Sequence, residues 1–396
     1  MTAAQADYPV YEPDLFAPDA LREPFGHYRA IRDLGPVVKL KHPDVFALGR
    51  FEDVREALRS PETLISGQGV MFNALFNVPV EPPLITQAGG DYHARLRGVI
   101  APLLMPAALK AQREILKSML SDHLAGLMAR ARNGEAVDAV ADLAQYLPWH
   151  AVRELVGLPT EGRDRMLLWS NAGFNCMGPE PLAEEDTAPF MEPRTWFRAV
   201  DPQDLATGSW SAALFEAVAQ GKLMEQEARS LLSGLVMPSL DTTILASANL
   251  LYHLARNPDQ WAALKADPAL IPAAVLEGVR YSAVVRWFSR VAADDYAKGE
   301  VTIPKGARVM IMYGAANRDE RHYPDPDTFD IRRNPKDQLG WGNGPHSCVG
   351  MHLAKVEMEL LLEVMLEQVE GFEAGPAALG ANRGLYGFEY VPLRMR

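Results

Sequence analysis

The chain has few cysteines and few basic residues for its length, and each shortage excludes a class of protein. Only two of its 396 residues are cysteines, Cys176 and Cys348, so neither a disulfide framework nor a four-thiolate zinc site is possible. Two sparse thiols favour a reducing compartment. Lysine and arginine together number 39 against 51 acidic residues, a net charge of −12, which argues against a nucleic-acid partner.

The sequence also lacks recognisable targeting and linker segments. Residues 1–7 contain no basic or long apolar run, so no secretory signal is expected and we place the protein in the cytoplasm. No Gly/Ser tract, charge block or repeat divides the chain, and residues 1–396 are expected to form a single domain that works as a monomer.

One stretch resembles a membrane span in length. Between Arg229 and Arg256 the only formally charged side chain is that of Asp241. An acid near the middle of a span costs about 2.5–3.5 kcal/mol on insertion scales, and Ser, Thr, Asn and Pro are scattered through the same stretch. We therefore expect a buried helix in a large domain and no membrane association.

Apolar residues recur at three- and four-residue spacing through most of the chain, which predicts a mainly helical fold. The clearest predicted helices cover residues 106–131, 136–156, 225–255, 271–280 and 351–369. Short β-rich segments at residues 37–40, 45–48, 301–303 and 309–313 predict a minor antiparallel β region.

The most informative segment is a glycine-rich loop at residues 339–350, which reads LGWGNGPHSCVG. Its glycines and Pro345 predict a tight loop whose backbone can approach a bound group closely. Cys348 stands at the end of this loop, just before a predicted helix, where backbone N–H groups and the helix dipole favour a thiolate. A thiolate held by backbone donors is what an axial ligand to haem iron requires.

Three other interpretations of this loop compete. A buried structural cysteine leaves the glycines unexplained. A dinucleotide-binding loop needs a third glycine where Pro345 stands, and a strand directly before it. A zinc site made of His346, Cys348 and His352 lacks a fourth ligand nearby.

The pattern Trp341-Gly-x-Gly-x-His-x-Cys-x-Gly350 resembles the haem-binding signature of the cytochrome P450 monooxygenases, with Trp341 where phenylalanine is usual. The resemblance extends in order over nearly the whole chain. It implies the cytochrome P450 fold, a single triangular, helix-rich domain, and haem b (iron protoporphyrin IX) as cofactor. By this resemblance Cys348 is the proximal thiolate and metal ligand, Trp341 covers the sulfur, and His346 lies near a haem propionate.

Further basic positions match the same family. His93 and Arg97 are four residues apart, so they project from one helix face, and two such donors suit an anionic group such as a propionate. Arg290 matches the family's third propionate contact. As isolated residues these side chains would be interpreted as surface charges.

Glu277 and Arg280 are three residues apart and match the family's buried Glu-x-x-Arg pair. Without the resemblance they would be interpreted as a solvated surface pair. Thr328 stands where many members have the arginine that completes the pair. Arg332 or Arg333 is the expected substitute.

Asp241 and Thr242 lie inside the long apolar stretch, where burying an acid and a hydroxyl is costly unless they are used or satisfied. A purely structural alternative is a threonine bonded to a carbonyl one turn earlier. The pair resembles the family's acid–alcohol pair, which implies a catalytic role in delivering protons during oxygen activation. Pro238 and Ser239 replace the family's small residues, and the proline predicts a kink.

Several segments are expected to roof the haem and bind the substrate, although each of their side chains could equally be core. The expected pocket residues are Gln68, Val70, Phe72, Phe76, Phe174, Met177, Leu240, Arg286 and Trp287. These segments resemble the bacterial branch that removes alkyl groups from methoxy-substituted aromatic compounds. Benzoate-binding members have an arginine at the position of Gln68, so a neutral methoxyphenol is favoured over a methoxybenzoate unless Arg286 supplies the charge.

The resemblance implies a monooxygenase that uses O2 and two electrons to O-demethylate or hydroxylate a small aromatic substrate. No flavin or iron–sulfur motif is present, so a separate ferredoxin and an NAD(P)H-dependent ferredoxin reductase are expected as partners. Lys355 is a candidate docking residue, or simply part of a solvated helix face. A peroxide-driven member of the family, a non-catalytic haem-thiolate sensor and a haem-free carrier of apolar ligands remain alternatives.

Overall fold

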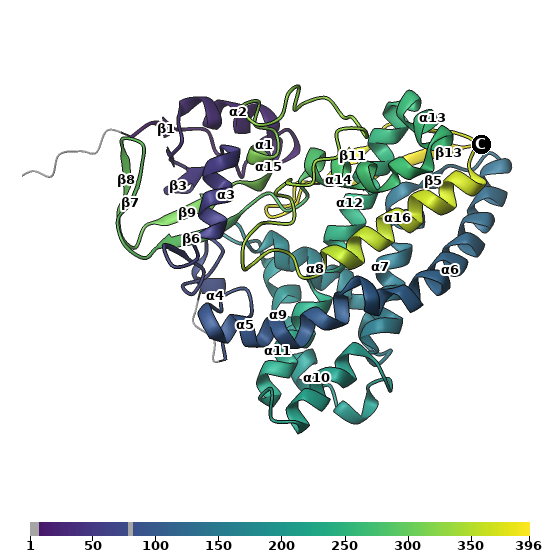
Figure 1. Cartoon of the computed structure of the whole chain (residues 1–396), viewed down its shortest axis with the longest axis horizontal. Helices are drawn as coiled ribbons and strands as arrows, with labels where there is room; N and C mark the ends of the chain where they lie inside the picture. Colours follow the sequence, from purple (N-terminus) through teal and green to yellow (C-terminus); the bar gives the residue numbers. More distant parts are fainter. Residues whose placement is uncertain (1–7, 78–81) are drawn as a thin grey trace, which may run out of the picture.

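A computed structural model of the chain describes residues 8–77 and 82–396, and most of the described residues are helical (Figure 1). The helices are, in chain order, α1 (Pro18–Arg22), α2 (Phe25–Leu34), α3 (Phe51–Arg59), α4 (Ala74–Asn77), α5 (Gly90–Ile100), α6 (Pro106–Arg132), α7 (Tyr146–Ala151), α8 (Met166–Asn175), α9 (Glu184–Ala199), α10 (Trp210–Ala219), α11 (Glu225–Val236), α12 (Leu240–Arg256), α13 (Pro258–Ala266), α14 (Ile271–Ser282), α15 (Tyr313–Ala316) and α16 (Met351–Gln368).

The largest sheet lies beside the amino-terminal helices, on the side of the molecule away from α6 and α16 (Figure 1). Its strands are, in spatial order, β1 (Val10–Tyr11), β2 (Val38–Leu40), β3 (Val45–Leu48), β9 (Arg308–Ile311), β6 (Phe288–Ala292) and β4 (Leu64–Ile65). The β region differs from the prediction in one detail, because the β1–β2 and β3–β9 pairs are parallel. Strands β3 and β9 come from distant parts of the chain, so no hairpin imposes an antiparallel arrangement on them.

Smaller antiparallel sheets complete the β structure of the described residues. Their strands are β5 (Val137–Asp138), β13 (Pro392–Met395) and β10 (Phe372–Ala374), then β11 (Ala378–Leu379) with β12 (Phe388–Tyr390), and β7 (Tyr296–Lys298) with β8 (Val301–Ile303). The segment predicted as a helix over residues 136–156 therefore begins as a strand, in which Val137 pairs with Leu393. Two π-helical segments, Ala139–Ala144 and Val152–Val156, then flank α7.

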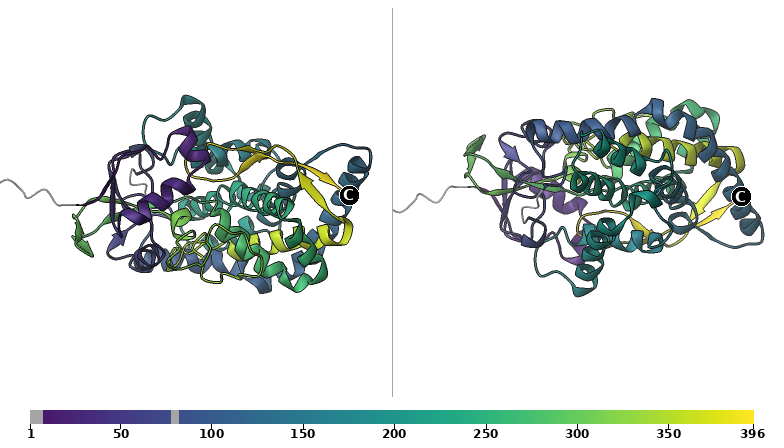
Figure 2. Two further views of the ribbon diagram at one scale, coloured as in Figure 1. Left: turned by 90° about the horizontal axis from the view of Figure 1, so that it is seen from above. Right: turned by 90° about the horizontal axis from the view of Figure 1, so that it is seen from below.

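Helix α12 runs through the middle of the helical part, and α11 leads into it (Figure 2). Together they cover Glu225–Arg256, which by length and composition alone could cross a membrane. Most side chains of α12 are buried, and they pack against α14, α16, α8 and α7. The predicted single helix is interrupted at Met237–Ser239, because Pro238 has no N–H to continue the helical hydrogen bonds.

The Glu277–Arg280 pair is fully buried and bidentate, with N–O distances of 2.7 and 2.8 Å. Arg280 also donates to the carbonyls of Asn317 and Pro326, which ties α14 to the segment that leads into the cysteine loop. The third partner is Arg333, whose Nε lies 3.4 Å from Glu277 Oε1, whereas Arg332 is exposed.

Replacing Glu277 by alanine should lower the stability of the fold far more than replacing Arg333 by alanine. Glu277→Ala leaves the buried guanidinium of Arg280 without its carboxylate, and breaking such a pair costs about 3–5 kcal/mol. Arg333→Ala leaves the Glu277–Arg280 pair intact, so we expect a smaller loss. Thermal unfolding of both variants measures the difference. Equal losses, or an unchanged midpoint in Glu277→Ala, would contradict this account of the network.

Candidate functional site

A deep cavity lies between α12 and α16 and is closed by the cysteine loop, α5 and β6. Its walls are mostly apolar, and the polar side chains that reach it come from widely separated parts of the chain. Cys348 faces it from the loop, Thr242 from α12, and Arg290 from β6. The structure thus brings together residues that sequence patterns connected only through a family resemblance.

The cysteine loop leaves no room for a side chain at Gly344. Gly344 has a φ of +70°, and a Cβ at this residue would lie 2.2 Å from the carbonyl oxygen of Leu58. Gly342 has a similar φ of +69°, but its Cβ would meet nothing closer than 3.8 Å. The loop then folds back, and the Cys348 amide donates to the carbonyl of Trp341 at 2.8 Å.

The Cys348 sulfur opens onto the cavity, and protein atoms surround it on its other sides. Burial raises the pKa of the Cys348 thiol, whereas hydrogen bonds from the amides of Gly350 and Met351 and the charge of Arg97 act in the opposite direction. The sulfur therefore has the backbone donors that were expected from its place before α16. Trp341 lines the cavity beside it, with the Lys355 ammonium 5.1 Å from the ring centroid.

Four basic side chains face the cavity from three segments. His93 and Arg97 come from α5, Arg290 from β6 and His346 from the loop, and the rings of His93 and His346 lie 4.2 Å apart. No carboxylate among the described residues forms an ion pair with any of these four, although Arg97 donates weakly to Ser347 Oγ at 3.4 Å. An anionic ligand would satisfy this cluster.

The cluster is also largely desolvated. Burial, assisted by His93, Arg290 and Arg97, lowers the pKa of His346 to about 3, and burial also lowers the pKa of His93. Tyr313 lines the same cavity, and its hydroxyl is hydrogen-bonded to Arg290. The two histidines are therefore uncharged near neutral pH in the protein without a ligand, and the cations without a counter-charge are Arg97 and Arg290, whose desolvation is costly.

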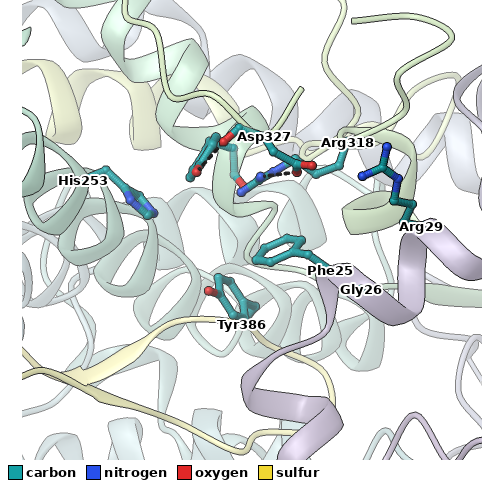
Figure 3. Close-up of a pocket in the computed structure, with 8 residues that line it drawn as sticks. Phe25, Gly26, Arg29, His253, Arg318, Asp327 and Tyr386 are labelled. Carbon is teal, nitrogen blue, oxygen red and sulfur yellow. Dashed lines mark hydrogen bonds and ion pairs between the residues drawn. The ribbon is translucent and has the colours of Figure 1, made fainter. Parts of the chain in front are cut away.

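A second cavity also contains a buried arginine, but there the arginine is paired with a carboxylate (Figure 3). It has a volume of about 320 Å3 and lies between α2 and the end of α12. Its central guanidinium, that of Arg318, is sandwiched between the rings of Phe25 and Tyr281 and is bonded to Asp327 at 2.7 Å. The Asp327 carboxylate thus neutralises the Arg318 guanidinium, whereas no carboxylate of the described residues pairs with Arg97 or Arg290.

Asp241 and Thr242 open α12 directly after the helix break. Thr242 lines the cavity and donates to the carbonyl of Pro238 at 2.6 Å. Asp241 is buried behind it, and its Oδ2 has no hydrogen-bond partner. Burial raises the pKa of Asp241 to about 7, partly offset by hydrogen bonding to Ser170, so its carboxyl group exchanges protons near neutral pH.

Of the predicted substrate residues, Val70 and Phe174 line the cavity. Phe76 belongs to α4, but its side chain lies outside the part of the chain that the structure describes. Gln68 is exposed, and its carbonyl accepts a hydrogen bond from Arg308. Leu240 is buried in the core beneath the cavity.

The remaining predicted substrate residues pack elsewhere. Phe72 stacks on Trp287 at 4.2 Å, and Met177 belongs to the same apolar cluster. Arg286 donates to the carbonyls of Leu385 and Leu21, so its charge is not available to a ligand. Successive residues of an extended chain point to opposite faces, which is why Phe288 reaches the cavity and Trp287 does not.

Some cavity residues were not identified from the sequence. Ile85 and Thr86 complete the wall on the Thr242 side, and they carry no motif. Glu357 faces the cavity from α16 with Oε1 unpartnered, and burial raises its pKa to about 8. Glu357 stands between Lys355 and Glu359 in the sequence, so its local context did not distinguish it from a solvated helix face.

The chemistry of the cavity fits haem. An apolar slot between two helices suits a flat macrocycle, and the thiol of Cys348 supplies an iron ligand at one wall. The basic cluster lacks counter-charges, and two propionates would supply them.

Comparisons with known proteins agree with this fit. The family model of cytochrome P450 matches residues 268–372. Cytochrome P450 CYP199A2 of Rhodopseudomonas palustris is 34% identical over 387 residues, which cover 96% of this chain and 93% of that protein. Cytochrome P450-terp of a Pseudomonas species is 30% identical, with 90% of this chain and 87% of that protein covered. The crystal structure of CalO2 superimposes with a TM-score of 0.83 at 25% identity, over 97% and 99% of the two chains.

The two loop glycines provide a matched test of the cysteine loop. Both Gly344→Ala and Gly342→Ala place a Cβ on a residue with positive φ, but only Gly344→Ala also drives it into the Leu58 carbonyl. We expect Gly344→Ala to lose most of its haem and Gly342→Ala to retain most of it. Haem content per polypeptide, measured on the purified variants, checks this. Equal retention by both would contradict the steric argument.

Proposed function

Because the chain belongs to the cytochrome P450 family, we propose that it is a monooxygenase that demethylates a small, neutral methoxy-aromatic compound. Proteins of this family bind haem b through a cysteine thiolate. In this chain we assign the thiolate to Cys348, with Trp341 beside it. His93, Arg97, Arg290 and His346 are the proposed propionate contacts. Haem held by these residues would supply the activation of O2 and the transfer of one oxygen atom to the substrate.

The substrate's proposed neutrality follows from the charges around the cavity. The wall on the Thr242 side is formed by Val70, Ile85, Thr86, Phe174, Pro238, Ser239, Val284, Val285 and Phe288. None of these side chains carries a charge, and the four basic side chains are those assigned to the propionates. A carboxylate buried against this wall would be unpaired, which is costly, whereas a neutral aromatic ring would pack on Phe174 and Phe288.

The proposed reaction oxidises the methyl carbon of the ether. One atom of O2 enters a C–H bond of the methyl group, and two electrons and two protons reduce the other atom to water. The resulting hemiacetal breaks its C–O bond to give a phenol and formaldehyde. Hydroxylation of an alkyl side chain uses the same machinery and is the second candidate outcome.

Asp241 and Thr242 are the proposed proton-delivery residues. Thr242 donates its own proton to Pro238 O, so the lone pairs of its Oγ1 remain free to accept a hydrogen bond from the cavity. The carboxyl of Asp241, with its pKa raised to about 7, supplies a proton at neutral pH and can be reprotonated. This arrangement favours a monooxygenase that uses O2 over a peroxide-driven enzyme.

Bacterial relatives generally receive electrons from redox partners. We propose a ferredoxin with an NAD(P)H-dependent reductase in the cytoplasm. Lys355 is the candidate contact, because its ammonium lies over the Trp341 ring, next to the cysteine loop.

A pair of ligands that differ mainly in charge tests the proposed substrate class. 4-Methoxybenzamide and 4-methoxybenzoate have nearly the same shape, but only the second carries a carboxylate. We expect the amide to bind at least about ten-fold more tightly, since the neutral wall offers no partner for the charge. Titration of the haem spin-state change measures both affinities, and product analysis separates demethylation from hydroxylation. Tighter binding of the benzoate would overturn the proposal.

Two phenylalanines supply the matched variants for this test. Phe174→Ala should weaken binding of the amide, because Phe174 lines the cavity. Phe72→Ala should change it little, because Phe72 stacks on Trp287 away from the cavity. Equal effects of the two variants would contradict the assigned wall.

A further inference from the structure

The break between α11 and α12 is bridged by hydroxyl groups. Thr242 bonds to Pro238 O at 2.6 Å and Ser239 to Val236 O at 2.8 Å. The third hydroxyl comes from another helix: Ser170 of α8 donates to Met237 O at 2.6 Å. Ser170 is almost completely buried, at 1% exposure, so this bond is shielded from water.

Ser170 also interacts with the acid on the same turn. Hydrogen bonding with its hydroxyl lowers the pKa of Asp241, against the larger effect of burial. Oδ2 of the buried Asp241 has no hydrogen-bond partner, while Ser170 donates to Met237 O, four residues before Asp241. The Ser170 hydroxyl thus lies beside a carboxyl group that has an unpartnered oxygen, and in the structure it donates to the backbone carbonyl.

The number of protons limits what Ser170 can do. A serine hydroxyl carries one donor hydrogen and two acceptor lone pairs. While it donates to Met237 O, it can only accept from Asp241, which requires Asp241 to be protonated. An ionised Asp241 accepts only, so Ser170 must turn its hydrogen toward the carboxylate and leave the Met237 carbonyl without it.

We propose that Ser170 is a positioning residue whose single hydroxyl proton moves between the Met237 carbonyl and the Asp241 carboxylate as Asp241 loses and regains its own proton. No covalent bond to Ser170 changes, because the hydroxyl only rotates. The break thus has two hydrogen-bonding states, and each corresponds to one protonation state of Asp241.

The consequence for function rests on the proposed role of Asp241 in proton delivery. Residues of the same turn line the cavity, namely Pro238, Ser239 and Thr242. A change in the hydrogen bonding of the Met237 carbonyl therefore occurs next to the Pro238 carbonyl, which accepts the hydrogen bond of Thr242. Phe174 lies four residues after Ser170 on α8, on the same helix face, and contacts the cavity. One helix therefore carries both a wall of the ligand cavity and the partner of the acid.

Few other ionisable groups surround this turn. Helix α8 contains none. On the elements packed around α12, Glu277 is paired with Arg280 in α14, and Asp142 bonds to Arg130. His150 in α7 donates to the Tyr146 carbonyl, and Glu357 faces the cavity from α16. Beyond α8, Glu192 of α9 is engaged by Arg165 and Trp169, and burial lowers the pKa of Arg194.

Infrared spectroscopy of the haem-loaded protein tests the proposal without turnover. The carbonyl stretch of protonated Asp241 is identified as the band that Asp241→Asn removes, and its pH titration gives the midpoint. In Ser170→Ala the ionised carboxylate loses its donor, so we expect the midpoint to rise by about one pH unit. Ser170→Thr keeps a hydroxyl and should titrate like the wild type.

Ser211→Ala is the matched control, because Ser211 is also buried and donates to a backbone carbonyl, that of Val156, but on another helix. An unchanged midpoint in Ser170→Ala, or an equal shift in Ser211→Ala, overturns the proposal. Wild-type protein provides a second measurement that does not depend on how Ser170→Ala folds. Hydrogen exchange of the amides at residues 239–242 should accelerate through the Asp241 midpoint, relative to Asp241→Asn. Identical pH profiles of hydrogen exchange in wild type and Asp241→Asn would also overturn the proposed role of Ser170, and this result does not depend on the identity of the substrate.

Discussion

The need to neutralise a dry cluster of basic side chains dominates this molecule. His93, Arg97, Arg290 and His346 face one cavity, and no carboxylate of the described residues pairs with them. Arg97 and Arg290 thus lie in a desolvated site without a counter-charge, and haem would bring two carboxylates for them as well as an iron for Cys348. The rest of the fold holds these side chains in place: α14 and Arg333 support the cysteine loop, and the sheet carries Arg290.

Sequence patterns predicted those parts of the site that depend on short-range chemistry. The loop around Cys348 and the four-residue spacing of His93 and Arg97 follow from local geometry, and the structure contains both. The helical prediction succeeded for the same reason, since apolar periodicity is local. It was wrong at the start of residues 136–156, where pairing with the carboxy-terminal strand, a distant partner, makes residues 137–138 the strand β5, while helical structure follows from residue 139. Pro238 was expected to kink a single helix, and the structure instead interrupts the helix there.

The substrate wall could not be predicted as well, because a side chain's direction depends on tertiary packing. Trp287 and Phe288 are adjacent aromatic residues, yet only Phe288 reaches the cavity. Arg286 was considered as a partner for an anionic substrate, but its guanidinium donates to two backbone carbonyls and does not line the cavity. Ser170 carries no motif at all, and only the folded chain brings it to Met237 and Asp241. On our proposal, a partner of the proton-delivery acid, Ser170, and a wall of the cavity, Phe174, come from the same helix, α8.

Haem ligation by Cys348 is the claim on which the whole account depends. The most direct measurement is the absorption spectrum of the reduced protein with carbon monoxide, recorded for wild type, Cys348→Ala and Cys176→Ala. We predict the red-shifted Soret band of thiolate-bound haem in the wild type and in Cys176→Ala, whose thiol is buried away from the cavity, and its loss in Cys348→Ala. A protein that takes up no haem, or a Cys348→Ala variant that keeps the band, would contradict the account.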